Sequence, residues 1–458
     1  MTIATINPAT GHTVKTFDAA TPEEVDRQLE RAIQAFGEWR SSSFATRGAV
    51  CEAAAGILDA EADELGALMT LEMGKTLGEA KAEVAKCARA FRFYAAHAEE
   101  QLAEQPADAS AVGARRAAVR FQPLGPVLAV MPWNFPLWQV TRFAAPNLMA
   151  GNVGLLKHAS NVPQTALAFE DVLRRAGAAE GVFQTLLIGS DMVAAVLTDP
   201  RVRAATVTGS NAAGQSVAQI AGEETKKTVL ELGGSDPFVV LPSADVQAAV
   251  KVGVKARCQN NGQSCIAAKR FIVHAGVAEE FQKGFVDAMR ALKVGDPTQP
   301  ATAIGPLATK QSRATVAEQV GDAVAKGAKV LCGGEVPEGD GWYYPPTVVT
   351  GITSEMRMHH EEVFGPVAQL YVVASLDEAI AVANDTPFGL GANVWTQDPA
   401  EQERSIAELE AGMVFVNGYT ISFPELPFGG VKASGYGREL GTTYGIREFC
   451  NTKTVWIG

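Results

Sequence analysis

The chain contains 458 residues, 47% of them hydrophobic and 20% charged, which is enough apolar material for more than one globular domain. A formal net charge of −12 argues against a nucleic-acid-binding protein and against a protein held at a membrane surface by basic residues, since both need clustered Lys and Arg. The six cysteines are scattered and none has the spacing of a zinc site, so we expect no metal centre.

The N-terminal segment MTIATINPAT has neither the basic nor the apolar region of a secretion signal, and scattered cysteines suit a reducing compartment. We therefore predict a cytoplasmic protein. Residues 121–141 carry no charge over a length that could cross a bilayer, but they contain four prolines that would interrupt a helix. We predict buried strand and loop in this region and no membrane segment.

Helical patterns dominate residues 21–100, and we interpret the Glu and Ala positions of residues 47–105 as solvent-exposed helix faces. From residue 124, short apolar runs from VLAVM to TVLEL alternate with helical patterns, and a second series runs from PFVVL to GMVFVNG. Such alternation predicts two α/β units with parallel sheets covered on both faces. We place the boundary near ELGGSDP, where two glycines and a proline separate adjacent strands.

Two further strands are predicted outside these units. The segment RRAAVRFQP alternates as a strand does, and its Arg-rich edge fits a hairpin that pairs across subunits. The C-terminal segment EFCNTKTVWIG has the pattern of one more strand beyond the second unit.

A phosphate-binding turn is predicted at VTGSNAAG, which follows a strand and opens a helix. Gly209, Ser210 and the first N–H groups of that helix could hold a pyrophosphate at the carboxyl edge of the sheet. The signal is weak by itself. The glycine-rich GYGRELG at 435–441 lacks a preceding strand, and we interpret it as a turn.

The segment CQNNGQSC places Cys258 and Cys265 before a predicted strand. Alone, Cys265 fits a buried structural cysteine better than a nucleophile, because a nucleophile also needs a base and an oxyanion donor. Glu231 in ELGGSDP is a candidate base, and Asn134 in PWNFP is a candidate donor. None of the three is specific singly.

Seven motifs occur together in an order that resembles the aldehyde dehydrogenase superfamily over essentially the whole chain. They are PWNFP (132–136), GNVGLLKHAS (151–160), TGSNAAG (208–214), LELGGSDP (230–237), NGQSC (261–265), EEVFGPV (361–367) and PFGGVKASGYGRE (427–439). Within the superfamily, LLKHAS, ELGGSDPF, AAKRFIV and NGYTIS look most like bacterial succinate-semialdehyde dehydrogenases.

The resemblance implies an enzyme that oxidises an aldehyde to a carboxylic acid with NAD or NADP. Cys265 matches the nucleophile that forms a thiohemiacetal and then a thioester, whereas Cys258 matches no functional position and is expected to be a packing residue. The Asn134 amide and the Cys265 backbone N–H would hold the oxyanion. Glu231 would activate the water that releases the acid.

Family matches also assign the cofactor residues. They imply Lys157 at the adenosine ribose, Gly209 and Ser210 at the pyrophosphate, Trp133 along the cleft, Glu362 at the nicotinamide ribose and Phe364 against the ring, with Gly214 in helix packing. Strict NAD users often carry a glutamate three residues after this lysine, and here Ser160 leaves room for a 2′-phosphate. We therefore expect NADP to be preferred and NAD to be possible. His158 is expected on the surface.

The substrate is the least constrained part of the prediction. Arg142 and Ser422 match positions that hold the carboxylate in succinate-semialdehyde dehydrogenases, which favours succinate semialdehyde. A second arginine that some relatives place six residues before the nucleophile is replaced by Gln259, which weakens that assignment. Glutarate semialdehyde or an uncharged aliphatic aldehyde stays open as a substrate, as do a cysteine esterase and a catalytically silent binding protein.

The expected fold is α/β, with two doubly wound, Rossmann-like parallel-sheet domains and a small β element for oligomerisation. Residues 1–106 and 123–233 would form the cofactor-binding domain, 234–440 the catalytic domain, and 107–122 with 441–458 the bridging element. The enzyme is expected to be a homodimer or homotetramer.

Overall fold

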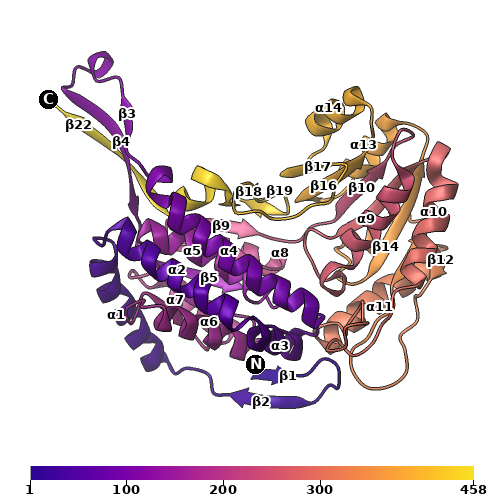
Figure 1. The fold of residues 1–458 in the computed structure, drawn as a ribbon, viewed down its shortest axis with the longest axis horizontal. Helices are drawn as coiled ribbons and strands as arrows, with labels where there is room; N and C mark the ends of the chain where they lie inside the picture. The colour runs from indigo at the N-terminus through magenta and orange to yellow at the C-terminus, as the bar shows by residue number, and fades with distance from the viewer. Residues whose placement is uncertain (1) are drawn as a thin grey trace.

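The computed structural model describes residues 2–458 and contains two central sheets with a third, small sheet that projects from the body (Figure 1). Two parallel sheets were expected from the two series of apolar runs. Across residues 2–458, no helix is both long enough and apolar enough to cross a membrane.

The first sheet has the strand order β20-β9-β8-β5-β6-β7. Strands β5 to β9 are parallel, whereas the short β20 is antiparallel to β9. Their side chains are buried on both faces, as continuous apolar runs require. The bounds are β5 (Pro126–Met131), β6 (Val153–His158), β7 (Phe183–Thr185), β8 (Ala204–Thr208), β9 (Lys227–Glu231) and β20 (Gly435–Tyr436).

Helices of the N-terminal half cover this sheet. Helices α1, α5, α6 and α8 pack on its strands, and α2, α3 and α4 form a further layer over α5 and α6. Helix α1 begins at a capping box between Thr21 and Glu24. The bounds are α1 (Pro22–Trp39), α2 (Phe44–Ala60), α3 (Ala62–Met73), α4 (Leu77–Gln101), α5 (Trp138–Ala150), α6 (Pro163–Arg175), α7 (Val193–Thr198) and α8 (Asn211–Glu223).

The second sheet has the strand order β12-β13-β14-β11-β10-β16-β17, and all neighbours are parallel except β12 and β13. Alternate residues of β10 point to opposite faces, so Phe238 packs with α9 and α10 while Val239 packs with α13. The strands are β10 (Asp236–Val240), β11 (Ala268–His274), β12 (Lys329–Cys332), β13 (Thr347–Thr350), β14 (Val367–Val373), β16 (Gly391–Trp395) and β17 (Met413–Val416). The helices are α9 (Val246–Cys258), α10 (Ala275–Arg290), α11 (Lys310–Ala325), α12 (Arg357–His360), α13 (Leu376–Asn384) and α14 (Pro399–Glu408).

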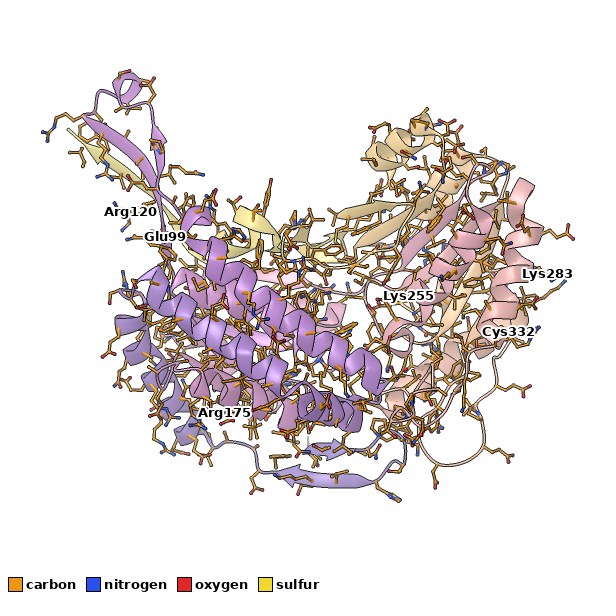
Figure 2. All side chains as sticks on the ribbon, viewed as in Figure 1. Glu99, Arg120, Arg175, Lys255, Lys283 and Cys332 are labelled. Atoms are coloured by element: carbon orange, nitrogen blue, oxygen red, sulfur yellow. The ribbon has the colours of Figure 1, made fainter. Side chains whose placement is uncertain are left out.

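The third sheet forms an arm that extends away from the body beside the C-terminus (Figure 1). It consists of β3 (Gln105–Ala107), β4 (Arg116–Pro123) and β22 (Cys450–Ile457), all antiparallel in the order β22-β4-β3. Figure 2 shows Arg120 near the base of this arm, where Arg120 and Arg116 both form ion pairs with Glu104. The basic edge of this strand is therefore partly neutralised by a neighbouring carboxylate.

Several short elements complete the fold. A hairpin of β1 (Ile3–Ile6) and β2 (Thr13–Phe17) opens the chain. Two-residue strands pair as β15 (Phe388–Gly389) with β19 (Val431–Lys432) and as β18 (Pro427–Phe428) with β21 (Glu439–Leu440). Single-turn helices are η1 (Ser110–Val112), η2 (Ser190–Met192) and η3 (Gln259–Gly262), and a π-type turn, η4, covers Gly441–Gly445.

The GYGRELG segment differs from the expected turn because it contributes both β20 and β21. Gly435 pairs with Glu231, and a Cβ at Gly435 would lie 2.0 Å from the Leu230 carbonyl oxygen, so only glycine permits this approach.

The predicted boundary at residue 233 falls between β9 and β10. Residues 435–436 nevertheless join the first sheet, so the C-terminal part of the second unit returns to the first.

Candidate active site

A cavity of about 270 Å³ collects most of the residues that the motifs single out. Its wall combines the end of β8 and β9 in the first sheet with the loops before β11 and β14 in the second. The lining residues are Pro132, Trp133, Asn134, Gln139, Thr208, Gly209, Ser210, Glu231, Leu232, Gly233, Cys265, Glu362 and Phe364. The predicted nucleophile, base and oxyanion donor therefore share one wall.

The loop before Cys265 is held in an unusual backbone conformation. Asn260 and Asn261 both have left-handed φ angles, 56° and 57°, which asparagine tolerates better than most residues. The Asn261 amide donates hydrogen bonds to the carbonyls of Gly74 at 2.8 Å and Pro306 at 3.0 Å. These contacts hold the loop before Cys265 against the end of α3 and the loop before α11.

The Cys265 side chain is half-buried. Burial raises the pKa of its thiol to about 12, although the nearby cations Arg142 and Lys269 act to lower it. Lys269 donates to the Cys265 carbonyl at 2.6 Å and forms an ion pair with Glu362 at 3.0 Å. The thiol therefore holds its proton at neutral pH and needs a base before it can attack.

Asn134 is 3% exposed and held in place at both ends of its amide. Its Nδ2 donates to the Gln263 carbonyl at 3.1 Å, and its Oδ1 accepts from Gln139 Nε2 at 3.4 Å. An amide nitrogen carries two hydrogens, so one N–H remains for an oxyanion at the sulfur.

Glu231 ends β9 and is 2% exposed. Neither of its carboxyl oxygens hydrogen-bonds to any residue within 2–458. Its pKa is raised well above the ordinary 4.5, mainly by burial and next by the negative charge of the neighbouring Glu439. A buried carboxyl without partners costs stability, and such groups occur preferentially where an acid or base is needed.

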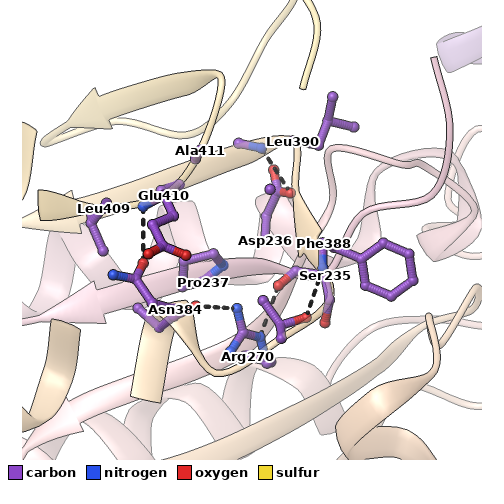
Figure 3. Close-up of a pocket in the computed structure, with 15 residues that line it drawn as sticks. Ser235, Asp236, Pro237, Arg270, Asn384, Phe388, Leu390, Leu409, Glu410 and Ala411 are labelled. Carbon is purple, nitrogen blue, oxygen red and sulfur yellow. Dashed lines mark hydrogen bonds between the residues drawn. The ribbon is translucent and has the colours of Figure 1, made fainter. Parts of the chain in front are cut away.

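The ELGGSDP turn that follows Glu231 is clamped from behind by Arg270. Figure 3 shows the small cavity there, where Arg270 donates to the Ser235 carbonyl at 2.8 Å. Arg270 also donates to the carbonyls of Val382 at 2.8 Å and Ala383 at 2.7 Å. Asp236 Oδ1 accepts from the Gly391 N–H at 3.1 Å. This cavity, of about 10 Å³, is too small for a substrate, and the contacts around it hold the turn in place.

Five of the predicted cofactor residues line the cavity, and Lys157 and Ser160 do not; the five are Trp133, Gly209, Ser210, Glu362 and Phe364. Ser210 caps α8, and a Cβ added at Gly209 would meet nothing within 4 Å, so the helix N-terminus faces open space. The rings of Trp133 and Phe364 lie edge to face with centroids 5.7 Å apart. Among residues 2–458, no carboxylate pairs with the Lys157 ammonium, and burial lowers the pKa of this group. An anionic dinucleotide suits this donor set.

The structure agrees with the expectation for Gly214 but not with the one for His158. Gly214 allows close packing as expected, since a Cβ there would lie 2.5 Å from Leu232 Cδ2. The surface placement expected for His158 is wrong: it is buried, its Nδ1 accepts from the Ala159 N–H and its Nε2 contacts the Pro136 carbonyl. Burial lowers the pKa of His158 to about 4, so it is neutral at pH 7 and holds the PWNFP turn.

The predicted substrate residues lie beside the cavity and are not among its lining residues. Arg142 is 2% exposed, with its Nε 2.9 Å from Glu439 Oε2 and its guanidinium 4.3 Å from the Phe428 ring centre. Ser422, 4% exposed, accepts hydrogen bonds from Trp138 Nε1 at 3.0 Å and Lys86 Nζ at 2.7 Å. Ser160 follows β6 and is half-buried.

Lys86 is the residue that sequence reasoning missed. It lies on α4, where the Glu and Ala positions were expected to face solvent although Glu83 and several alanines are buried. Its ammonium reaches Ser422 across 336 residues of sequence. The buried positions Val84 and Cys87 on either side of it mark the edge of the apolar stripe. A lysine at that edge is the signal that could have identified it.

Comparisons with known proteins support one family. The model of the aldehyde dehydrogenase family matches residues 1–455. Succinate-semialdehyde dehydrogenase [NADP(+)] of Mycobacterium avium is 64% identical over 100% of this chain and 97% of its own, and a Mycobacterium tuberculosis enzyme of that name is 63% identical over 100% of both chains. A solved succinic semialdehyde dehydrogenase from Streptococcus pyogenes in complex with NADP+ has 39% identity and a TM-score of 0.96 over 99% of both chains.

Proposed function

The chain belongs to the aldehyde dehydrogenase family, and on this premise we propose that it oxidises succinate semialdehyde to succinate with NADP. The observation that supports the reaction is the single cavity shared by Cys265, Asn134 and Glu231. The substrate and cofactor follow relatives that are 62–64% identical over the whole chain and are named for both.

Glu231 and Cys265 begin the reaction. The unpartnered Glu231 carboxylate takes the thiol proton, directly or through a water, and Cys265 Sγ attacks the aldehyde carbon. The resulting oxyanion accepts hydrogen bonds from Asn134 Nδ2 and the Cys265 backbone N–H. One such donor contributes about 3–4 kcal/mol to transition-state stabilisation.

NADP, when bound, accepts the hydride that leaves the thiohemiacetal carbon. Cys265 then holds the acyl group as a thioester. Glu231 releases the thiol proton to solvent and then removes a proton from the water that hydrolyses the thioester. Because burial and Glu439 raise the pKa of Glu231, its conjugate acid can return a proton to the sulfur at the end of the cycle.

Ser160 and Lys157 support NADP over NAD. Lys157 has no described carboxylate partner, so it can match the extra charge of a 2′-phosphate. Ser160 stands where a glutamate would repel that phosphate, and it adds no negative charge. The roles of Trp133, Gly209, Ser210, Glu362 and Phe364 in holding the rest of the dinucleotide are part of the same proposal.

Arg142 and Ser422 are proposed to lie nearest the substrate carboxylate. The field of Arg142 is reduced by its ion pair with Glu439. An Arg142→Ala variant that folds and still oxidises succinate semialdehyde at the wild-type rate would contradict its part in substrate binding.

A substrate panel tests the proposed activity. Reduction of NADP is measured with succinate semialdehyde, glutarate semialdehyde and butanal, and hydrolysis of an ester is measured without cofactor. The proposal expects the highest kcat/KM for succinate semialdehyde. A higher value for butanal or glutarate semialdehyde would overturn the substrate, and ester hydrolysis without any NADP reduction would overturn the reaction.

The location and assembly are also proposals. We propose a cytoplasmic homo-oligomer in which the arm of β3, β4 and β22 contacts a second copy. The arm presents Trp456, 56% exposed, and Ile457, 39% exposed, far from the rest of the core. In the second sheet, β17 is an edge strand that pairs only with β16.

A further inference from the structure

A partly buried polar cluster lies beside the candidate active site on α4, α5 and the loop after β17. Ser422 Oγ accepts from Lys86 Nζ at 2.7 Å and from Trp138 Nε1 at 3.0 Å. Lys86 Nζ also lies 4.2 Å from the centre of the Trp138 ring. The next residue on α5, Gln139, lines the Cys265 cavity.

The Ser422 hydroxyl has a donor without an acceptor. An ammonium and an indole N–H can only donate, so both lone pairs of the Ser422 oxygen are occupied. Its own O–H must then donate, and no acceptor for it occurs within residues 2–458. The cluster therefore has a place for a hydrogen-bond acceptor.

The Lys86 ammonium has a charge without a counter-ion. Every charged group around it is already matched: Glu83 pairs with Lys75, Arg89 with Glu425 at 2.5 Å, and Arg142 with Glu439 at 2.9 Å. No described carboxylate pairs with Lys86 itself. Burial and the nearby Arg142 lower the pKa of Lys86 to about 8, which shows that the charge is costly without an anion.

The cluster is linked to the reacting centre through the first residues of α5. Trp138 donates to Ser422, and the next residue, Gln139, lines the Cys265 cavity. Gln139 bridges the two places, because it follows Trp138 and donates to Asn134 Oδ1 at 3.4 Å. The start of α5 therefore connects the cluster with the cavity of Cys265.

We propose that Lys86, together with Ser422, binds the distal carboxylate of the substrate and makes the enzyme selective for short aldehydes that carry a terminal carboxylate. One carboxylate oxygen accepts from the Lys86 ammonium and the other from the Ser422 hydroxyl. This inference rests on the proposed function. Arg142, neutralised by Glu439, contributes less to charge selectivity than Lys86 does.

The test compares succinate semialdehyde with butanal, which has the same number of carbons and no carboxylate. The measured quantity is the ratio of the two kcat/KM values with NADP. Losing one charge-assisted hydrogen bond should lower this ratio by about 10- to 100-fold in Lys86→Met, mainly through KM for succinate semialdehyde. Lys86→Arg should keep a ratio nearer to that of the wild type, and Ser422→Ala should lower it.

Lys81→Met is the matched control, since Lys81 lies on the same helix and pairs with Asp63 at the surface. Its ratio should equal that of the wild type. An unchanged ratio in Lys86→Met overturns the inference, and if that variant does not fold, an unchanged ratio in Ser422→Ala overturns it instead. A wild-type enzyme with no preference for succinate semialdehyde over butanal overturns the proposed function, whatever the variants do.

Discussion

Burial without a hydrogen-bond partner distinguishes Glu231, the proposed base, from Arg270, a buried residue that holds the fold. The buried Arg270 guanidinium donates hydrogen bonds to three carbonyl oxygens, whereas both carboxyl oxygens of Glu231 lack a described hydrogen bond. A buried group of the second kind costs stability and is retained where chemistry needs it. The same reasoning separates Lys86 from Lys75, which is fully paired with Glu83.

The pH dependence of activity follows from Glu231. Its raised pKa means that the base form appears only at higher pH than for an ordinary glutamate, so kcat/KM should rise with pH through this value. In Glu439→Gln a neighbouring negative charge is lost and Arg142 is freed from its ion pair, and both changes lower the pKa of Glu231. The rising limb should move to lower pH.

The control for this prediction is Glu425→Gln, a surface carboxylate that pairs with Arg89. Its pH profile should match that of the wild type. A rising limb that stays in place in Glu439→Gln, or moves to higher pH, would show that another group sets it.

The cofactor preference is argued at Ser160. A Ser160→Glu substitution places a carboxylate where the 2′-phosphate is proposed to bind, so repulsion should lower kcat/KM for NADP and leave NAD favoured relative to the wild type. Initial rates with both cofactors measure the ratio. Ser160→Gln is the control for size, and an equal shift in that variant would mean that bulk and not charge decides the preference.

At the scale of the element, helix α8 packs closely, through Gly214, against Leu232, the residue that follows β9. A methyl group at Gly214 would lie 2.5 Å from Leu232 Cδ2, next to Glu231. Overpacking of this kind costs about 1–3 kcal/mol, which outweighs the gain of about 1 kcal/mol that alanine brings to a helix. Gly214→Ala should therefore lower the thermal midpoint of unfolding.

Gly222 on the same helix provides the comparison. A Cβ there meets nothing within 4 Å, so Gly222→Ala should leave the midpoint unchanged or raise it. Thermal unfolding followed by circular dichroism gives both midpoints. A Gly214→Ala midpoint at or above that of Gly222→Ala would contradict the account of α8.

Periodicity predicted the long elements well because their apolar runs report burial directly. VLAVM, ATVTG, TVLEL and PFVVL all form buried strands. The pairing of Gly435 with Glu231 could not be predicted, since a two-residue strand is created by a partner about 200 positions away and has no local pattern. Similarly, His158 was placed on the surface because its hydrogen bond to the Pro136 carbonyl is tertiary.

The candidate site was accessible from sequence in its chemistry but not in its charge balance. The motifs around Asn134, Glu231 and Cys265 led to the residues that the cavity brings together. The ion pair of Arg142 with Glu439 and the unpaired ammonium of Lys86 depend on how α4, α5 and β21 pack. Those contacts set the local field, and no single segment contains them.

At the scale of the whole molecule, the arm predicts the assembly. It exposes apolar side chains at Trp456 and Ile457 on a three-stranded sheet that projects from the body, and exposed apolar side chains of this kind mark a contact surface. Trp456→Glu should therefore shift the enzyme toward a smaller species in sedimentation velocity. Val14→Glu, at an exposed position of the N-terminal hairpin, is the control. Equal shifts in both variants would show that the arm does not make the contact between subunits.

The most direct test of the central claim is nicotinamide reduction by the purified enzyme with succinate semialdehyde, run with NADP and NAD in parallel and with a Cys265→Ala control. The account predicts rapid formation of NADPH, slower formation of NADH, and neither in Cys265→Ala. Turnover that survives in Cys265→Ala would contradict the role of the cysteine. A wild-type enzyme that reduces neither cofactor with this substrate would contradict the proposed reaction.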